Sequence, residues 1–304
     1  MSGSPNSMRS ILFALGANFS IFIAKGFAAL YTGSGAMLAE AVHSLADAGN
    51  QLLLILGLKQ STRPPTPDYP LGFGKSIFFW SFLVAVVLFT MGGMFSVYEG
   101  IHKFQHPEPL NSPMIAIGVL VFAILAEAVS LWGCVREVNK ERFGRSYWKW
   151  FRQSRSSALV VVFGEDIAAL LGLVAALVAV SLTMITGNPV YDALGTIFIG
   201  ILLLVIALFI AREVKALLIG QGVDPRVLSE MKHFLSKQAE VEKVYNVLTL
   251  HMGDDVMVAV KARMVSTGSE TGLLQAVNRV ETGFRTAFPQ IVWLFFEPDS
   301  TDEN

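Results

Sequence analysis

Six ionisable side chains lie within long apolar stretches of this chain: Glu40, His43, Asp47, Glu127, Glu165 and Asp166. The first three follow an i, i+3, i+7 spacing, which places them within about 60° of one face of a helix. Ionisable residues within a bilayer span are costly, and by default they mark a transport pathway or a proton relay. Carboxylates with one imidazole and no thiolate suit a divalent cation that accepts mixed oxygen and nitrogen ligands.

The same residues suggest how such a site would be emptied. Without metal it would hold uncompensated negative charge in a low dielectric, so we expect protons to load it in exchange for the metal. His43 is the expected proton-coupled ligand, because imidazole titrates near neutral pH and binds metal only when neutral. Two carboxylates would supply the charge. For Glu127 a purely structural interpretation stays open, since a single buried carboxylate can pair with Lys25 or bond to a neighbouring backbone.

The composition places these side chains in a membrane. The chain is 53% hydrophobic and 15% charged, whereas soluble domains are roughly 45–50% apolar and about 25% charged. A transmembrane helix needs about 20 mostly apolar residues. Six segments meet this condition, and we expect spans near Ile11–Tyr31, Gly35–Leu58, Ser76–Ile101, Met114–Val135, Ala158–Thr186 and Val190–Ile210.

The orientation follows from the positive charges in the connections. Lys and Arg concentrate between spans 2 and 3, between spans 4 and 5, and after span 6, whereas the alternate connections carry only Lys103. Both termini are therefore expected in the cytoplasm, or in the matrix if the membrane is mitochondrial. No cleavable signal peptide or Arg-rich transit peptide is evident, so a bacterial inner (plasma) membrane is the simpler expectation.

The pattern changes from membrane to soluble after Gly220. Pro225 opens an amphipathic helix to about Gln238, capped by Asp224. Two strands and a Gly253 turn, a second helix and a third strand follow. Their expected ranges are Val244–His251, Val256–Val265, Glu270–Phe288 and Ile291–Phe296. We therefore predict a transmembrane domain over 1–220 and a small α+β domain over 221–304, of α-β-β-α-β ferredoxin-like kind.

Several function classes are excluded. A net charge of −1 argues against nucleic acid as a partner. A single cysteine, Cys134, removes disulfide, zinc-ribbon and iron–sulfur interpretations. An intramembrane metalloenzyme would need a motif such as His-Glu-x-x-His, and only one histidine lies within a predicted span. A membrane-anchored metal sensor or scaffold would leave the polar stripe of span 2 unexplained.

Four motifs carry a family resemblance. They are Ala39-Glu40-Ala41-Val42-His43-Ser44-Leu45-Ala46-Asp47, Pro70-Leu71-Gly72-Phe73-Gly74, Gly164-Glu165-Asp166-Ile167-Ala168-Ala169 and Thr186-Gly187-Asn188-Pro189-Val190-Tyr191-Asp192. With six spans and an α-β-β-α-β tail, the sequence resembles the cation diffusion facilitator family of divalent-metal/proton antiporters. The resemblance covers essentially the whole chain and favours the branch that contains the animal mitochondrial zinc exporter.

The resemblance implies a transport site with His43 and Asp47 from span 2 and Asp166 from span 5. The family's usual fourth ligand is a histidine, and this chain has Val162 at that position, which cannot ligate. Glu165, Glu40 or water must then complete the site.

Neither glutamate is an ideal replacement. On an ideal helix Glu165 points about 100° away from Asp166, so it would reach the same ion only through its side-chain length or a local distortion. Glu40 lies at least one turn towards the outer side, which suits a role in exit or proton handling.

The family's other metal sites are not preserved. In the connection between spans 2 and 3 only Asp68 remains. In the C-terminal domain, Leu248, Lys261 and Phe295 or Phe296 occupy the positions of the family's histidine ligands. A lysine would repel a cation, so this domain is expected to dimerise without binding metal. His233 and His251 are expected to be ordinary surface or fold residues.

Together these inferences predict a homodimeric antiporter that exports Zn²⁺ from the cytoplasm in exchange for protons. Alternating access would expose one site between spans 2 and 5, and the chain would be neither an enzyme nor in need of a cofactor. An acidic ligand in place of histidine makes the site harder, so Mn²⁺, Fe²⁺ or Co²⁺ remain alternative substrates.

Overall fold

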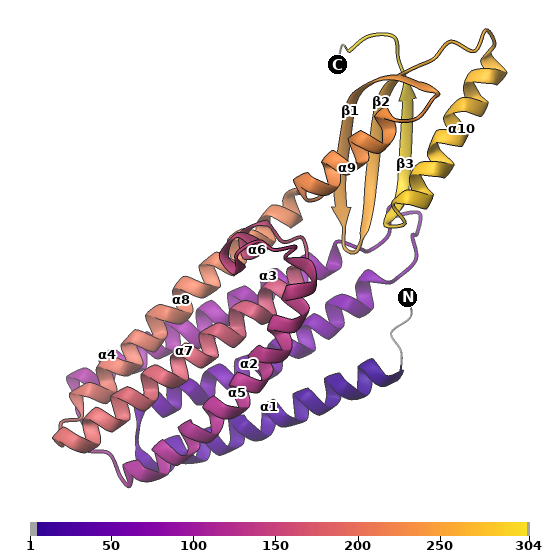
Figure 1. Ribbon diagram of the computed structural model, residues 1–304. Helices are drawn as coiled ribbons and strands as arrows, with labels where there is room; N and C mark the ends of the chain where they lie inside the picture. The colour runs from indigo at the N-terminus through magenta and orange to yellow at the C-terminus, as the bar shows by residue number, and fades with distance from the viewer. Residues whose placement is uncertain (1–4, 303–304) are drawn as a thin grey trace.

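The computed structural model describes residues 5–302, and the side chains of residues 19–302. A bundle of long helices occupies one end of the molecule and a small α+β domain the other (Figure 1). The bundle comprises α1 (Pro5–Thr32), α2 (Gly35–Ser61), α3 (Ser76–Val87), η1 (Leu88–Met94), α4 (Phe95–Gln105), α5 (Pro113–Glu141), α6 (Tyr147–Gln153), α7 (Ser157–Thr186) and α8 (Val190–Ile219).

Five helices in the described residues are long and apolar enough to cross a membrane, with α3, η1 and α4 forming one continuous helix. The first predicted span lies in α1, and its described part, Phe19–Thr32, is mainly apolar but shorter than a full span. Most of the helices run beyond the predicted spans. For example, α5 continues to Glu141 and α8 to Ile219, because hydropathy marks the bilayer whereas helical hydrogen bonding continues into the aqueous layer.

Helix α2 lies at the centre of the bundle, packed against α1, α3, α7 and α8. Its first turn is held by Asp192 of α8, whose carboxylate accepts hydrogen bonds from the Ser34 hydroxyl at 2.5 Å and the Gly35 amide at 2.6 Å. The Ser34 hydroxyl in turn accepts from the Met37 amide. A negative side chain at a helix N-terminus satisfies free N–H groups and favours the helix dipole. The helix that carries three of the six ionisable residues is thus fixed at its outer end.

The π-helical segment η1 was not predicted from the sequence. It contains Gly92 and Gly93, and a Cβ on Gly93 would lie 3.0 Å from the backbone nitrogen of Leu204 on α8. Small residues let two membrane helices approach through their backbones, and π-helical turns occur often at functional sites. The segment lies beside α2, at the height of His43.

The C-terminal domain consists of α9 (Pro225–Ser236), β1 (Val241–Met252), β2 (Asp255–Met264), α10 (Glu270–Ala287) and β3 (Ile291–Pro298), in the predicted order. The sheet order is β1-β2-β3, with β1 and β2 antiparallel and β2 and β3 parallel. The predicted Asp224 cap is confirmed, since its carboxylate accepts from the Arg226 amide at 3.0 Å. The hairpin turns at Gly253, at φ +81°.

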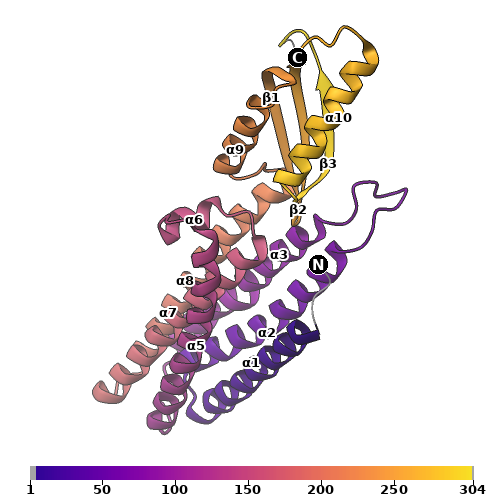
Figure 2. The same cartoon turned by 45° about the vertical axis from the view of Figure 1, so that its right-hand side comes forward.

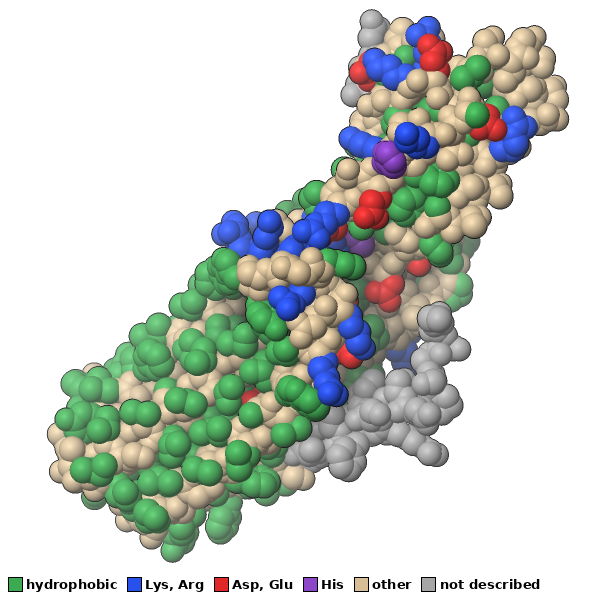
Figure 3. Space-filling view, viewed as in Figure 1, with side chains coloured by type: hydrophobic (Ala, Val, Ile, Leu, Met, Phe, Trp, Pro, Cys, Tyr) green, Lys and Arg blue, Asp and Glu red, His purple; other side chains and the backbone are tan. Residues whose placement is uncertain are grey.

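The C-terminal domain contacts the end of the bundle at which α2, α5 and α8 finish (Figures 1 and 2). Arg145, after α5, forms an ion pair with Asp224, and Arg155 donates to the Gly222 carbonyl at 2.7 Å. The loop before α3 approaches the β1–β2 turn so closely that a side chain on Gly74 would collide with the Met252 carbonyl. Lys and Arg gather at this junction, whereas the visible face of the bundle is mainly hydrophobic (Figure 3).

Candidate metal centre

Four carboxylates from three helices line one small cavity inside the bundle. The cavity has a volume of about 60 Å³. Asp47 comes from α2, Glu127 from α5, and Glu165 and Asp166 from α7; the other lining residues are Ile21, Ser44, Gln51, Ser130 and Val162. The structure thus brings together residues that are more than a hundred positions apart in the sequence.

The hydrogen bonds to these carboxylates come from neutral side chains. Glu165 accepts a hydrogen bond from the Asn50 amide at 2.5 Å, and the Ser130 hydroxyl lies 3.4 Å from Asp166. Within the described side chains, none of the four carboxylates forms an ion pair with Lys or Arg. Like charges this close in a low dielectric cannot all stay ionised without a counter-cation or protons.

His43 lies beside the cavity but does not line it. Its Nδ1 is 3.6 Å from Oδ1 of Asp47, and the ring is fully buried. Neither ring nitrogen has a hydrogen-bond partner, although buried polar atoms are normally paired. A Cβ on Gly92 would lie 4.0 Å from Nδ1, so the imidazole is packed between Asp47 and the π-helical segment.

Glu40 belongs to a different set of contacts. Its Oε2 lies 3.2 Å from the Lys25 ammonium on α1, which also donates to the Ser44 hydroxyl at 2.8 Å. Both Glu40 and Lys25 are buried. Glu40 is absent from the cavity lining, so the structure pairs it with a lysine and leaves it apart from the other carboxylates.

No three His, Cys, Asp or Glu side chains among the described residues converge tightly enough to hold a metal ion in this conformation. The donors nevertheless suit a divalent cation, because carboxylate oxygens with one nearby imidazole are the ligands that Zn²⁺ and Mn²⁺ accept. Glu165 and Asp166 line the same cavity despite being consecutive on α7, which removes the objection that they must point apart.

A larger cavity of about 820 Å³ joins the carboxylates to the end of the bundle that bears the C-terminal domain. It shares Gln51, Ser130, Val162 and Asp166 with the smaller one. It then runs between α2, α5 and α7 to Glu137, Glu141 and Ser156. In the other direction lie the buried residues Glu40, Met37 and Leu173. In this conformation the carboxylate cavity therefore adjoins an open groove on the side of the C-terminal domain.

Sequence reasoning gave no role to three residues near this site, Asn50, Ser130 and Asp192, and it considered Lys25 as a partner for Glu127, whereas the structure pairs Lys25 with Glu40. Asn50 is a polar residue in an apolar span, one helical turn after Asp47, and that spacing was an available signal. Asp192 lies in one of the family-like motifs, but its partners Ser34 and Gly35 are more than 150 positions away. Only the fold reveals that contact.

At the positions outside the bundle that correspond to the family's other metal ligands, the side chains make ordinary structural contacts or are exposed. Lys261 is 3.0 Å from Asp299 and 4.0 Å from Glu297, and Leu248 and Phe295 are exposed. Burial lowers the pKa of His251, although its ring bonds to the Gly253 carbonyl. Tyr69 packs on Phe73 in the loop after α2. That the C-terminal domain does not bind metal stays a prediction.

The long apolar helices define a multi-pass membrane protein. Residues 11–219 match the cation efflux transmembrane domain. The chain belongs to the cation efflux family, whose members are transporters and not enzymes.

Three named relatives show how far the similarity extends. The Xenopus laevis mitochondrial proton-coupled zinc antiporter SLC30A9 is 36% identical over 245 residues, which cover 80% of this chain and 44% of that protein. Metal tolerance protein C4 of Arabidopsis thaliana is 32% identical, over 79% of this chain and 53% of its own length. The Escherichia coli zinc transporter ZitB is 24% identical, over 90% and 82%. The chain thus spans about half the length of the first two relatives.

Proposed function

We propose that this protein exchanges a divalent metal cation, Zn²⁺, for protons across a membrane by alternating access at one site between α2 and α7. The observation that carries the proposal is the cavity lined by four carboxylates without a Lys or Arg partner. Such a cluster is stable only when a mobile cation or protons neutralise it. The relatives named as zinc antiporters and zinc transporters support the same function.

Asp47 and Asp166 are the proposed charged ligands, with Glu165 in place of the missing histidine at Val162. Glu165 is favoured over Glu40 because it lines the cavity, whereas Glu40 is paired with Lys25. We retain His43 as a ligand that joins when the helices move. Its unpartnered nitrogens and its 3.6 Å approach to Asp47 place it one small displacement from the carboxylates.

In the proposed cycle a hydrated cation enters along the larger cavity, past Glu137 and Glu141, and meets the carboxylates. Binding of the metal releases protons from the ligands, because metal and proton compete for the same oxygen and nitrogen atoms. Rearrangement of α2 and α7 then opens the outer side, where protons reload the ligands and discharge the metal. Glu127 faces the same cavity, and we assign it to proton handling.

The finer architecture belongs to the same proposal. We take α1 as the sixth span, the α-β-β-α-β unit as a ferredoxin-like dimerisation domain, and the domain boundary at residue 220. Both termini would face the cytoplasm of a bacterium. The mitochondrial relatives make the matrix the alternative location.

Mn²⁺ or Fe²⁺ is the competing substrate, because the cavity offers carboxylates rather than several imidazoles and a harder donor set favours harder ions. Proteoliposomes that contain a metal-sensitive dye would measure the initial flux of each ion. A preference for Mn²⁺ over Zn²⁺ at equal concentration would replace the zinc assignment while leaving the site intact.

The central test is the flux of Zn²⁺ in proteoliposomes that carry an imposed pH gradient. Asp166→Asn and Asp47→Asn should abolish uptake, and Glu165→Gln should reduce it. Glu230→Gln, a change at an exposed residue of α9, is the matched control and should transport normally. Uptake that persists in either aspartate variant would refute the site. Uptake that does not respond to the pH gradient would refute the antiport.

A further inference from the structure

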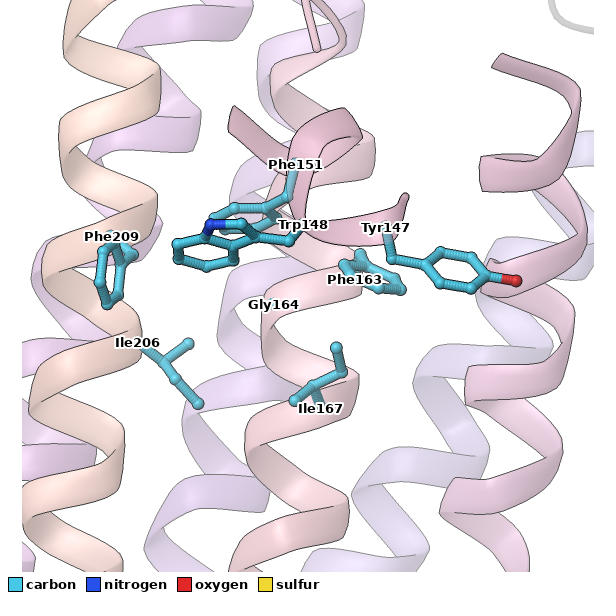
Figure 4. Close-up of a pocket in the computed structure, with 8 residues that line it drawn as sticks. All are labelled: Tyr147, Trp148, Phe151, Phe163, Gly164, Ile167, Ile206 and Phe209. Atoms are coloured by element: carbon cyan, nitrogen blue, oxygen red, sulfur yellow. The ribbon is translucent and has the colours of Figure 1, made fainter. Parts of the chain in front are cut away.

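A pocket lies on the membrane side of the short helix α6, away from the carboxylates. Its volume is about 200 Å³ and its lining is almost wholly apolar. Figure 4 shows its walls, contributed by α6, α7 and α8: Tyr147, Trp148, Phe151, Phe163, Gly164, Ile167, Ile206 and Phe209. Trp148 is 55% exposed and Phe209 36% exposed, so the pocket opens to the surroundings of the bundle.

The pocket owes its shape to the way α6 folds back onto the bundle. Ser146 caps α6 by accepting from the Lys149 amide. Trp150 is buried edge-on against Phe163 at a centroid distance of 5.4 Å. On the outer side Trp148 meets Phe209 edge-on at 5.4 Å, and this contact forms the rim. At the floor α7 packs closely on α8, since a Cβ on Gly164 would lie 2.8 Å from the Ile210 side chain.

Positive charge lies directly above this rim. Arg152 follows Trp148 by four residues on α6, and Arg212 follows Phe209 by three on α8, so each shares a helix face with a rim residue. Both arginines are exposed. Arg152, Arg155 and Arg212 all act electrostatically on one carboxylate, Glu213, so this surface keeps a net positive charge. Figure 3 shows the Lys and Arg side chains gathered over α6, where the hydrophobic bundle ends.

We propose that this pocket binds an anionic phospholipid, with one acyl chain among the aromatic side chains and the phosphate between Arg152 and Arg212. Aromatic side chains at the end of a hydrophobic bundle occupy the headgroup level of a bilayer. Basic pockets between membrane helices bind anionic headgroups, and guanidinium groups hold phosphate through paired charge-assisted hydrogen bonds. A zwitterionic lipid would fill the pocket equally well but would not compensate the net positive charge.

The occupant would touch the helix that carries the candidate metal site. Phe163 and Gly164 line the pocket and directly precede Glu165 and Asp166 on α7. An acyl chain held there packs between α6, α7 and α8, which must shift if the bundle alternates. This consequence rests on the proposed transport function, whereas the lipid binding does not.

Binding can be measured on the full chain by native mass spectrometry after incubation with phosphatidylglycerol or phosphatidylcholine of the same acyl chains. We expect preferential retention of phosphatidylglycerol, on the order of tenfold, because each arginine near the surface adds to the affinity for an anionic lipid. The double variant Arg152→Gln/Arg212→Gln should lose this preference. Lys232→Gln/Lys237→Gln removes the same charge from two exposed residues, one in α9 and one at its C-cap, and should keep the preference.

A second measurement tests the pocket itself without depending on retention in the gas phase. Phosphatidylglycerol with brominated acyl chains should quench part of the tryptophan fluorescence in nanodiscs. The quenching that is due to Trp148 should be absent in Trp148→Phe and weaker in the double arginine variant. Equal retention of both lipids, or unchanged quenching in Trp148→Phe, would overturn the proposal. So would a Trp148→Ala variant that alters the monomer–dimer ratio without altering lipid retention, since a second copy would then cover the pocket.

If lipid binding is confirmed, zinc flux in phosphatidylglycerol and phosphatidylcholine vesicles separates the two proposals. Equal flux in both lipids would be consistent with the lipid site but would contradict its proposed effect on transport. Absent flux in both lipids, with binding retained, would count against the proposed transport alone.

Discussion

Two groups of charged residues lie about two helical turns apart along α2, and they have opposite character. In the first, Glu40 is paired with Lys25, whose ammonium also donates to Ser44. In the second, Asp47 meets Glu127, Glu165 and Asp166 around one cavity, without a Lys or Arg partner among the described side chains. Both groups contain carboxylates in an apolar helix, so residue type alone does not separate them.

The comparison shows that the role of a buried carboxylate, structural or ion-binding, depends on the cation that neutralises it. A tethered ammonium neutralises Glu40 permanently, and the pair can form part of the structure. The second group accepts hydrogen bonds from neutral donors, namely Asn50 and Ser130, and no described Lys or Arg forms an ion pair with it, so most of the charge that balances it has to come from mobile ions or protons. A cluster of that kind can exchange metal for protons, whereas the first group cannot do so without breaking an ion pair.

The largest expected effect comes from breaking the first group. Lys25→Met leaves Glu40 buried without its cation, and loss of one partner of a buried pair costs about 3–5 kcal/mol. Thermal unfolding in detergent should show a large loss of stability. The double variant Lys25→Met/Glu40→Leu should recover most of it, because the uncompensated charge is gone. A single variant as stable as the wild type would mean that the pair is not structural.

The next effect comes from making the second group resemble the first. Val162→Lys would place a tethered ammonium in the cavity, where it would neutralise the carboxylates in place of a mobile metal. Zinc affinity should fall by about 100-fold, equivalent to about 2.7 kcal/mol. The measurement is zinc titration of the purified protein, with Val162→Met as the control for side-chain size. Unchanged affinity in Val162→Lys would place the metal elsewhere.

A smaller effect is expected at the outer end of α2. Asp192→Ala removes the acceptor for Ser34 and Gly35, and buried donors left without a partner cost about 1–3 kcal/mol. Hydrogen exchange should increase at the first turn of α2, together with a lower unfolding temperature. Asp192→Asn keeps an acceptor oxygen, so its exchange rate and unfolding temperature should lie between those of the wild type and Asp192→Ala. Unchanged exchange in Asp192→Ala would remove the anchoring role.

The smallest effect concerns the junction with the C-terminal domain. Partial burial alone would raise the pKa of Asp224, but the Arg226 amide and the Arg145 guanidinium outweigh it and hold the pKa below its usual value. The contribution of this carboxylate is therefore present above about pH 4, the usual Asp value, and is lost as the pH falls through the lower folded value. Asp224→Ala should cost about 1 kcal/mol as a lost helix cap.

Hydrogen exchange of the first α9 amides, measured from neutral pH to below about pH 4, tests whether the stabilisation by Asp224 is lost in acid. The wild type should lose protection in acid, and Asp224→Asn should show a weaker dependence. Protection that increases on acidification would contradict the assignment.

Much of the fold could be predicted because its signals are local. Apolar runs marked the membrane helices, the Asp224 cap marked the start of α9, and Gly253 marked the hairpin. Helix ends were less predictable, since α5 and α8 continue beyond their apolar residues. The helix α6 was not predicted within the basic connection between spans 4 and 5. Its seven residues are too few for a periodic pattern, and the packing of Trp150 and Phe151 stabilises them.

By itself the sequence determined that the chain is a membrane protein, that carboxylates in spans 2, 4 and 5 need an explanation, and that a soluble domain follows. These conclusions depend on composition and spacing along single helices. Only the tertiary structure decided which charges meet. It paired Glu40 with Lys25, turned His43 towards the π-helical segment, and placed Glu165 beside Asp166 in one cavity. The physical reason is that the energy of a buried charge depends on its neighbours in space, and those neighbours come from other helices.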